Sequence, residues 1–160
     1  MAVFQYTRTT YHGRSIVVPS TTICPLPAGL ARVVLLADIE NLAIALERFA
    51  CAISENLLLT WLKRHFSNPQ VWAFCAEDST GDYRTEVSHD DDMVKYIKPG
   101  RSFGYDMDAE ICITAATKIP KDADGVIIGS GDRHMLPLVL YLKEQGLHVG
   151  VLSVPGSTSS

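Results

Sequence analysis

The sequence predicts a doubly wound α/β domain, a three-layer α/β/α fold with a central, mainly parallel sheet. Two observations lead to this fold class. Short apolar runs rich in β-branched residues alternate with stretches of helical periodicity from residue 33 onward, and buried strands separated by helices are typical of parallel sheets. In addition, the chain has 160 residues, of which 47% are hydrophobic, and this suffices for the core of one domain.

Each predicted element has its own signal in the sequence. The strands are short apolar runs, and the helices carry apolar residues at spacings of three and four. The expected strands cover residues 33–37, 71–75, 124–129 and 147–152. The expected helices cover residues 41–51, 54–66, 108–117 and 134–145. Gly146 is the expected C-cap of the last helix.

Residues 76–107 have the weakest pattern, because they are polar and poorly periodic. The acidic run at 90–92 is interpreted as a helix start, since acids are favoured there. The apolar residues between Met93 and Ile97 would then belong to that helix.

The first thirty residues differ in composition from the rest. They are rich in Thr, Ser and Pro, with one β-like segment at 15–18 and a break at 25–29. We expect residues 1–30 to form an N-terminal extension, packed on the domain or partly loose. Residues 31–160 would form the domain itself.

The formal net charge of −4 gives no general attraction to nucleic acid or to anionic membranes. A polyanion would therefore be held locally, by a small basic patch or by bound metal. The candidate basic residues lie in the polar region and beside the turn at 129–132, and they are Lys95, Lys98, Arg101 and Arg133.

The four cysteines are too widely spaced for a Cys-x-x-Cys zinc or redox unit, and we interpret them as buried free thiols. No signal-peptide pattern opens the chain, and no apolar stretch approaches the roughly 18 residues that span a bilayer. We therefore expect a cytoplasmic protein without a membrane partner.

Two aspartates follow predicted strands. Asp38 ends the run at 33–37, and Asp132 follows the Gly-Ser-Gly sequence at 129–131. Sites in open parallel sheets form beyond the carboxyl ends of the strands, so these carboxylates should share one edge if their strands are neighbours. Either aspartate alone also suits the N-cap of the helix that follows it, which is the simpler interpretation.

A third acid is expected from residues 106–110. Asp106 and Glu110 share a helix face if the helix begins early, whereas Asp108 would serve if it begins late. Three carboxylates at one place repel each other unless a cation neutralises them, and hard oxygen ligands favour Mg²⁺ or Mn²⁺. A metal held in this way can activate water and neutralise charge that develops on a phosphodiester.

Four segments, taken in order, resemble the NYN domain, a branch of the PIN-like nuclease superfamily. They are Asp-Ile-Glu-Asn at 38–41, Tyr-Asp-Met-Asp at 105–108, Gly-Ser-Gly-Asp at 129–132 and Val-Pro-Gly-Ser-Thr-Ser at 154–159. The resemblance runs from Arg32 to the end of the chain. It implies a PIN-like fold and metal-dependent cleavage of RNA.

The resemblance also implies roles for individual residues. Asp38 and Asp132 would be metal ligands, and Asn41 would orient the substrate or a ligand water. Asp108 is the best match to the central acid of the family, with Asp106 as the alternative.

Two positions depart from the family pattern. His134 stands where a second acid usually follows the aspartate matched by Asp132, and Thr114 stands where another acid often occurs. An imidazole at 134 could ligate a borderline metal such as Mn²⁺, or act as an acid or base, but it removes a charge that favours Mg²⁺.

We therefore expect a metal-dependent endoribonuclease, with RNA as its partner. The alternative is a catalytically weak or inactive NYN-type module that binds RNA or a protein partner in a regulatory role. An exposed apolar patch would support a homodimer, although the sequence does not locate one.

Overall fold

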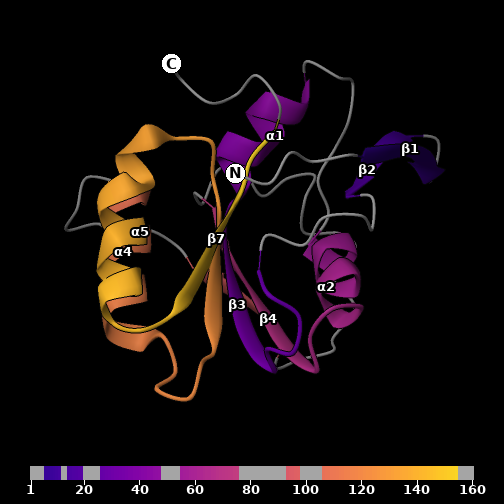
Figure 1. Ribbon diagram of the computed structural model, residues 1–160. Coiled ribbons are helices and arrows are strands. Elements are labelled where there is room, and N and C mark those ends of the chain that lie inside the picture. Colours follow the sequence, from indigo (N-terminus) through magenta and orange to yellow (C-terminus); the bar gives the residue numbers. More distant parts are fainter. Residues whose placement is uncertain are drawn as a thin grey trace.

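The computed structural model of the protein describes residues 6–11, 14–19, 26–47, 55–75, 93–97 and 106–154 (Figure 1). Its strands are β1 (Tyr6–Tyr11), β2 (Arg14–Pro19), β3 (Arg32–Asp38), β4 (Asn68–Phe74), β5 (Val94–Ile97), β6 (Gly125–Gly129) and β7 (His148–Leu152). Its helices are α1 (Ile39–Glu47), α2 (Glu55–Lys63), α4 (Met107–Lys118), the 3-10 turn η3 (Arg133–Met135) and α5 (Leu136–Glu144).

One parallel sheet organises the domain, with the strand order β5-β4-β3-β6-β7. β3 is central and pairs with β4 on one side and with β6 on the other, so that Ala37 lies opposite both Ala73 and Gly129. Because all the pairings are parallel, the strands end together. We call this the C-terminal edge, formed by Asp38, Phe74, Ile97, Gly129 and Leu152.

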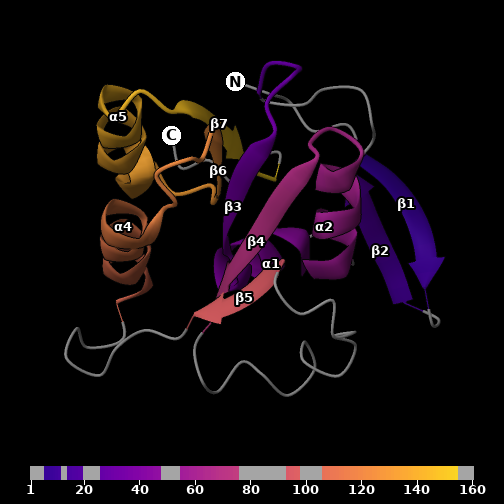
Figure 2. The ribbon, with the colours of Figure 1, turned by 90° about the horizontal axis from the view of Figure 1, so that it is seen from below.

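Helices cover both faces of this sheet (Figures 1 and 2). The side chains of β3 alternate between the two faces, as expected for a strand buried on both sides. Leu35 packs in one cluster with Leu62 of α2, while Leu36 packs in the other with Ile111 of α4. The predicted three-layer α/β/α fold with a parallel sheet is therefore confirmed. Within the described residues, no helix is long and apolar enough to cross a membrane.

Two glycines meet specific backbone demands. Gly129 ends β6 so close to β3 that an added Cβ would lie 3.3 Å from the Cα of Ala37. Gly146 has a φ of +83° just after the end of α5, a conformation that glycine adopts without steric cost. The C-cap itself is Gln145, so Gly146 ends the helix from the position one residue beyond the one predicted.

The expected helix through Met93 and Ile97 is wrong, because Val94–Ile97 form the edge strand β5. Valine, tyrosine and isoleucine favour strands, and this segment lies beside the edge of β4. The neighbouring strand supplies backbone partners, since the amide of Val71 donates to the carbonyl of Met93 over 2.7 Å. The acidic run at 90–92 lies outside the described residues.

The segment before the parallel sheet contains a two-stranded antiparallel hairpin, β1-β2. The β-like segment predicted at 15–18 lies within β2, whereas β1 was not predicted. β2 lies beside α2 (Figure 2). Further along, Leu26 is buried in the same cluster as Leu35.

The two described cysteines are free thiols, as predicted, but only one of them is buried. Cys75 is buried and Cys112 is half-buried. Cys24 and Cys51 lie outside the described residues.

Candidate metal centre

The C-terminal edge brings together the two strand-end aspartates. Asp38 is the last residue of β3, and Asp132 comes three residues after the end of the adjacent strand β6. β3 and β6 are therefore neighbouring strands, as the predicted pairing of Asp38 with Asp132 requires. Residues far apart in the sequence meet because parallel strands end at one edge.

Asp38 is a buried acid with an unfavourable environment for its charge. Only 5% of the residue is exposed, and its Oδ1 accepts a 3.1 Å hydrogen bond from the backbone amide of Asn41. The pKa of Asp38 is raised to about 6, mainly by burial, and the bond from Asn41 opposes this rise. The charges of Asp108, Glu40 and Asp132 make smaller contributions to the same rise. Asp38 therefore caps α1. Its charged form is disfavoured by burial and by the neighbouring carboxylates.

Asn41 joins the two strand ends. Its Oδ1 accepts a 3.0 Å hydrogen bond from the backbone amide of Gly131, in the turn that leads to Asp132. The turn has a second internal contact, because the amide of Asp132 donates to the hydroxyl of Ser130 over 3.2 Å. Ser130 is only 2% exposed. Asn41 thus fixes the position of the turn that carries Asp132.

Ser130 and Glu40 also belong to the site and were not predicted from the sequence. A serine hydroxyl that accepts a hydrogen bond from the backbone amide two residues later is a recognised local turn pattern. Ser130 could therefore have been identified from the sequence. Glu40 lies two residues after Asp38, and its charge adds to the repulsion on that buried carboxylate. Ser130 accepts the amide of Asp132, and Glu40 adds negative charge near Asp38, so both residues act on the site through its aspartates.

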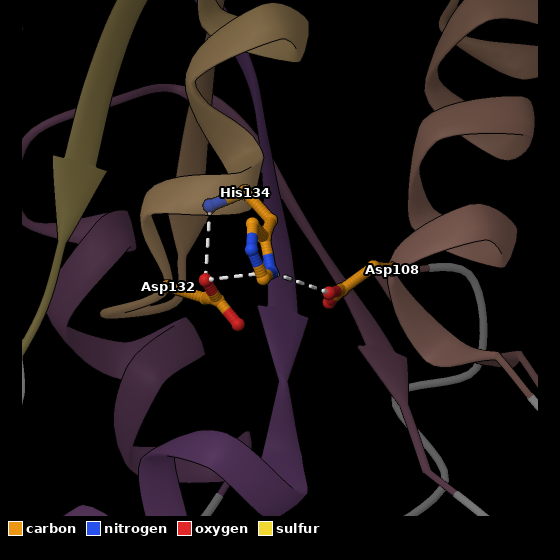
Figure 3. Close-up of side chains that lie close together, drawn as sticks. All are labelled: Asp108, Asp132 and His134. Atoms are coloured by element: carbon orange, nitrogen blue, oxygen red, sulfur yellow. Dashed lines mark hydrogen bonds and ion pairs between the residues drawn. The ribbon is translucent and has the colours of Figure 1, made fainter. Parts of the chain in front are cut away.

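The closest set of ligand-type atoms comes from Asp108, Asp132 and His134. One such atom from each residue lies within 4.8 Å of the other two. The Nδ1 atom of His134 is 3.3 Å from Oδ1 of Asp132 and 3.9 Å from Oδ2 of Asp108 (Figure 3). Asp38 is outside this set, although the charges of both acids reach it. Among the described residues, this is the one group of three with metal-ligand spacing.

The turn after β6 supplies two of the three residues. Asp132 is the N-cap of η3, and its Oδ1 accepts a 2.9 Å hydrogen bond from the backbone amide of His134. Its predicted capping role is therefore present, and the same oxygen lies against the imidazole. The side chain of His134 is 72% exposed, so a ligand or substrate can reach it.

Asp108 supplies the third group from the first turn of α4. It lies three residues before Ile111 and seven before Ala115, both buried, so it extends the buried face of the helix to the C-terminal edge. Burial raises the pKa of Asp108, as do the charges of Asp132 and Asp106, whereas His134 lowers it.

Asp106 has a different position from Asp108. It is the N-cap of α4, and its Oδ1 accepts a 3.2 Å hydrogen bond from the backbone amide of Ala109. The helix begins at Met107, so Asp106 lies outside it and Asp108, in its first turn, is the acid that joins the cluster. This is the arrangement expected for a helix that begins too late to include Asp106, and the metal-binding role of either acid stays a prediction.

Thr114 lies in the core below the site. It is fully buried, and its hydroxyl donates a 3.0 Å hydrogen bond to Oε1 of Glu110 one turn earlier. The threonine that departs from the family pattern is therefore satisfied within α4.

Of the basic residues expected to hold a polyanion, Arg133 is the one whose side chain is described. It is exposed in η3, between Asp132 and His134. The side chain of Lys95 is not described, and Lys98 and Arg101 lie outside the described residues.

A comparison with protein families agrees with this fold. The sequence pattern of the NYN domain matches residues 32–160, which is the part of the chain from β3 onward. Searches of curated proteins and of solved structures found no significant match. The matched segment contains the whole parallel sheet and all three residues of the cluster, and the chain therefore belongs to the NYN domain family, a family of PIN-like nucleases.

Proposed function

We propose that this protein is a metal-dependent endoribonuclease that hydrolyses RNA at the C-terminal edge of the sheet. The observation that carries the proposal is the convergence of Asp108, Asp132 and His134 beside the buried Asp38. The NYN match supports a nucleic-acid substrate.

The donor set fits a divalent cation. Burial first, and the neighbouring carboxylates second, raise the pKa values of Asp38 and Asp108, and a bound cation would favour the charged forms of these acids. Asp108, Asp132 and His134 would hold the ion. Two carboxylates and an imidazole suit Mn²⁺ better than Mg²⁺, which prefers oxygen ligands. Such an ion would activate water and neutralise charge on the phosphodiester.

The chain's own groups would position the reactants. Asn41 holds the turn at Gly131, so the Asp132 carboxylate is placed before substrate arrives. Arg133 is exposed next to the cluster and would contact a phosphate. His134, with its imidazole 3.3 Å from Asp132, would hold or release a proton if it does not ligate the metal.

The alternative function is a catalytically weak module that binds RNA or a protein partner. The observation that favours it is His134 itself, because an imidazole gives this set of ligands one negative charge less than an acid would. Weak binding of Mg²⁺ would leave such a site inactive.

Cleavage of a fluorescently labelled RNA tests the proposal. The wild type should cut in Mn²⁺ and stop in chelator, whereas Asp132→Asn should lose at least about 100-fold in rate, as expected when a charge-stabilising group is removed. Asp122→Asn is the matched control, since Asp122 is an exposed aspartate paired with Arg32 at the other end of β3. Equal cleavage by the wild type and by Asp132→Asn would refute the proposed ribonuclease activity at this site. Metal binding by calorimetry without any cleavage would favour the binding module.

A further inference from the structure

His134 adds a nitrogen donor to two carboxylates at the C-terminal edge. Its Nδ1 atom faces both of them, at 3.3 Å from Oδ1 of Asp132 and 3.9 Å from Oδ2 of Asp108 (Figure 3). One ligand-type atom from each of the three residues lies within 4.8 Å of the other two. The cluster is therefore a mixed set of nitrogen and oxygen donors around one place.

The number of donors favours an ion of low coordination number. Mg²⁺ demands octahedral geometry and oxygen ligands. Zn²⁺ is usually four-coordinate, and zinc sites with three protein ligands keep the fourth position for water or a substrate. The cluster supplies three donors, so the protein would fill most of the positions around Zn²⁺ but only half of those around Mg²⁺.

The separations between the donors are also close to those that zinc needs. Tetrahedral bonds of about 2.0–2.2 Å to nitrogen and oxygen place the ligand atoms about 3.3–3.6 Å apart. Nδ1 of His134 and Oδ1 of Asp132 are already at this separation. Nδ1 and Oδ2 of Asp108 would have to approach by about 0.3–0.6 Å. The side chain of His134 is mostly exposed, so a small rotation of the imidazole suffices.

The backbone holds Asp132 and His134 together independently of the imidazole. Oδ1 of Asp132 accepts its 2.9 Å hydrogen bond from the backbone amide of His134, and the side chains of Asn41 and Ser130 fix the same turn. Donors that are positioned in advance lose less freedom when they bind. Because the bond uses the backbone of His134, a substitution at this position changes the donor and keeps the contact that forms the turn.

We propose that this centre binds Zn²⁺ in preference to Mn²⁺ and Mg²⁺, and that Nδ1 of His134 is the ligand that sets the preference. Among divalent first-row ions, Mn²⁺ binds most weakly to a given nitrogen and oxygen site and Zn²⁺ far more tightly. The imidazole disfavours Mg²⁺, which prefers oxygen. The inference deepens the proposed function by naming the cation. It rests on the metal centre of that proposal, and it does not require cleavage of RNA.

Competition between the ions measures the preference. Free Mn²⁺ gives an electron paramagnetic resonance signal that is lost on binding, so the signal reports how much Mn²⁺ the protein holds. One equivalent of Zn²⁺ should release the Mn²⁺ bound to the wild type, with an affinity at least about 100-fold higher. The same concentration of Mg²⁺ should release almost none.

His134→Asp tests the role of the imidazole. The variant keeps three ligand-type residues and replaces nitrogen by oxygen, so the ratio of Zn²⁺ affinity to Mg²⁺ affinity should fall at least about tenfold. His148→Asn is the matched control. His148 is an exposed histidine at the start of β7, at the opposite end of the sheet from the centre, and its replacement should leave the wild-type ratio unchanged. Circular dichroism would verify the fold of both variants.

Equal binding of Zn²⁺ and Mn²⁺ to the wild type would overturn the proposal, and so would a His134→Asp variant that keeps the wild-type ratio. Cleavage of RNA in Mn²⁺ by a protein without zinc preference would overturn this inference and leave the ribonuclease in place. A zinc preference in a protein that does not cut RNA would support the inference and count against the ribonuclease.

Discussion

Replacing Asp38 by asparagine should stabilise the folded protein at neutral pH. Asparagine has nearly the same shape as aspartate and is an equally favoured N-cap, so its side-chain oxygen can still accept the amide of Asn41. What the substitution removes is the buried charge. In the wild type the pKa of Asp38 rises from 3.8 to about 6. At about 1.36 kcal/mol per pH unit, the charged form of Asp38 costs about 3 kcal/mol of folding free energy.

The sign of the pH dependence follows from the raised pKa. Between pH 4 and pH 6 the folded protein holds a proton on Asp38 that the unfolded chain has released, so the wild type loses stability as the pH rises through this window. Asp38→Asn lacks this loss. The variant should match the wild type near pH 4 and exceed it by about 3 kcal/mol above pH 7. Urea unfolding in chelator at several pH values would measure the difference.

Asp124→Asn provides a control of opposite sign. Asp124 accepts hydrogen bonds from the backbone amides of Ala31 and Arg32, both at 2.8 Å, and those bonds lower its pKa. Its stabilising effect is present at neutral pH and is lost as the pH falls through the lowered pKa, so this variant should be less stable than the wild type at pH 7. A lower stability of Asp38→Asn than of the wild type at pH 7.5 would contradict a raised pKa of Asp38. A stability difference that is the same at every pH would contradict it as well.

Three further substitutions test the contacts that hold the site in place and the charge of its ligand-type residues. Asn41→Ala leaves the buried amide of Gly131 without its partner, and calorimetric melting should show a loss of about 1–3 kcal/mol. Gly129→Ala forces a Cβ to 3.3 Å from the backbone of Ala37 in the central strand, and denaturant unfolding should show a loss of about 1–3 kcal/mol; an unchanged midpoint would mean that the strands can separate. His134→Asp restores an acid to the cluster, so isothermal titration should show Mg²⁺ binding tightened about tenfold, with Asp122→Asn unchanged.

Much of the fold was predictable because its signals are local. The apolar runs that became β3, β4, β6 and β7 are long enough to identify, and the pairing of Asp38 with Asp132 follows from parallel strands ending at one edge. β5 could not be identified in the same way. It has four residues in a polar region, and its partner β4, more than its own sequence, makes it a strand.

The candidate site shows the same division. Asp38 and Asp132 were found from their places after strands and His134 from its place in the NYN pattern, whereas the choice between Asp106 and Asp108 depends on where α4 begins. The local sequence allows either start, because acids are favoured throughout the first turn of a helix. The buried state of Asp38, and with it the raised pKa, is likewise a property of the assembled layers.

The three clustered side chains come from only two pieces of backbone. Asp132 and His134 share one short turn that the Asn41 side chain already ties to the first turn of α1, whereas Asp108 lies on α4, in a separate part of the chain. An ion held among them would therefore act as a cross-link between α4 and the turn that starts α5. Loading the site should slow hydrogen exchange in the first turn of α4 more than in the central strands, which the sheet already protects. Slower hydrogen exchange in that turn would then report that an ion occupies the site and links α4 to the start of α5.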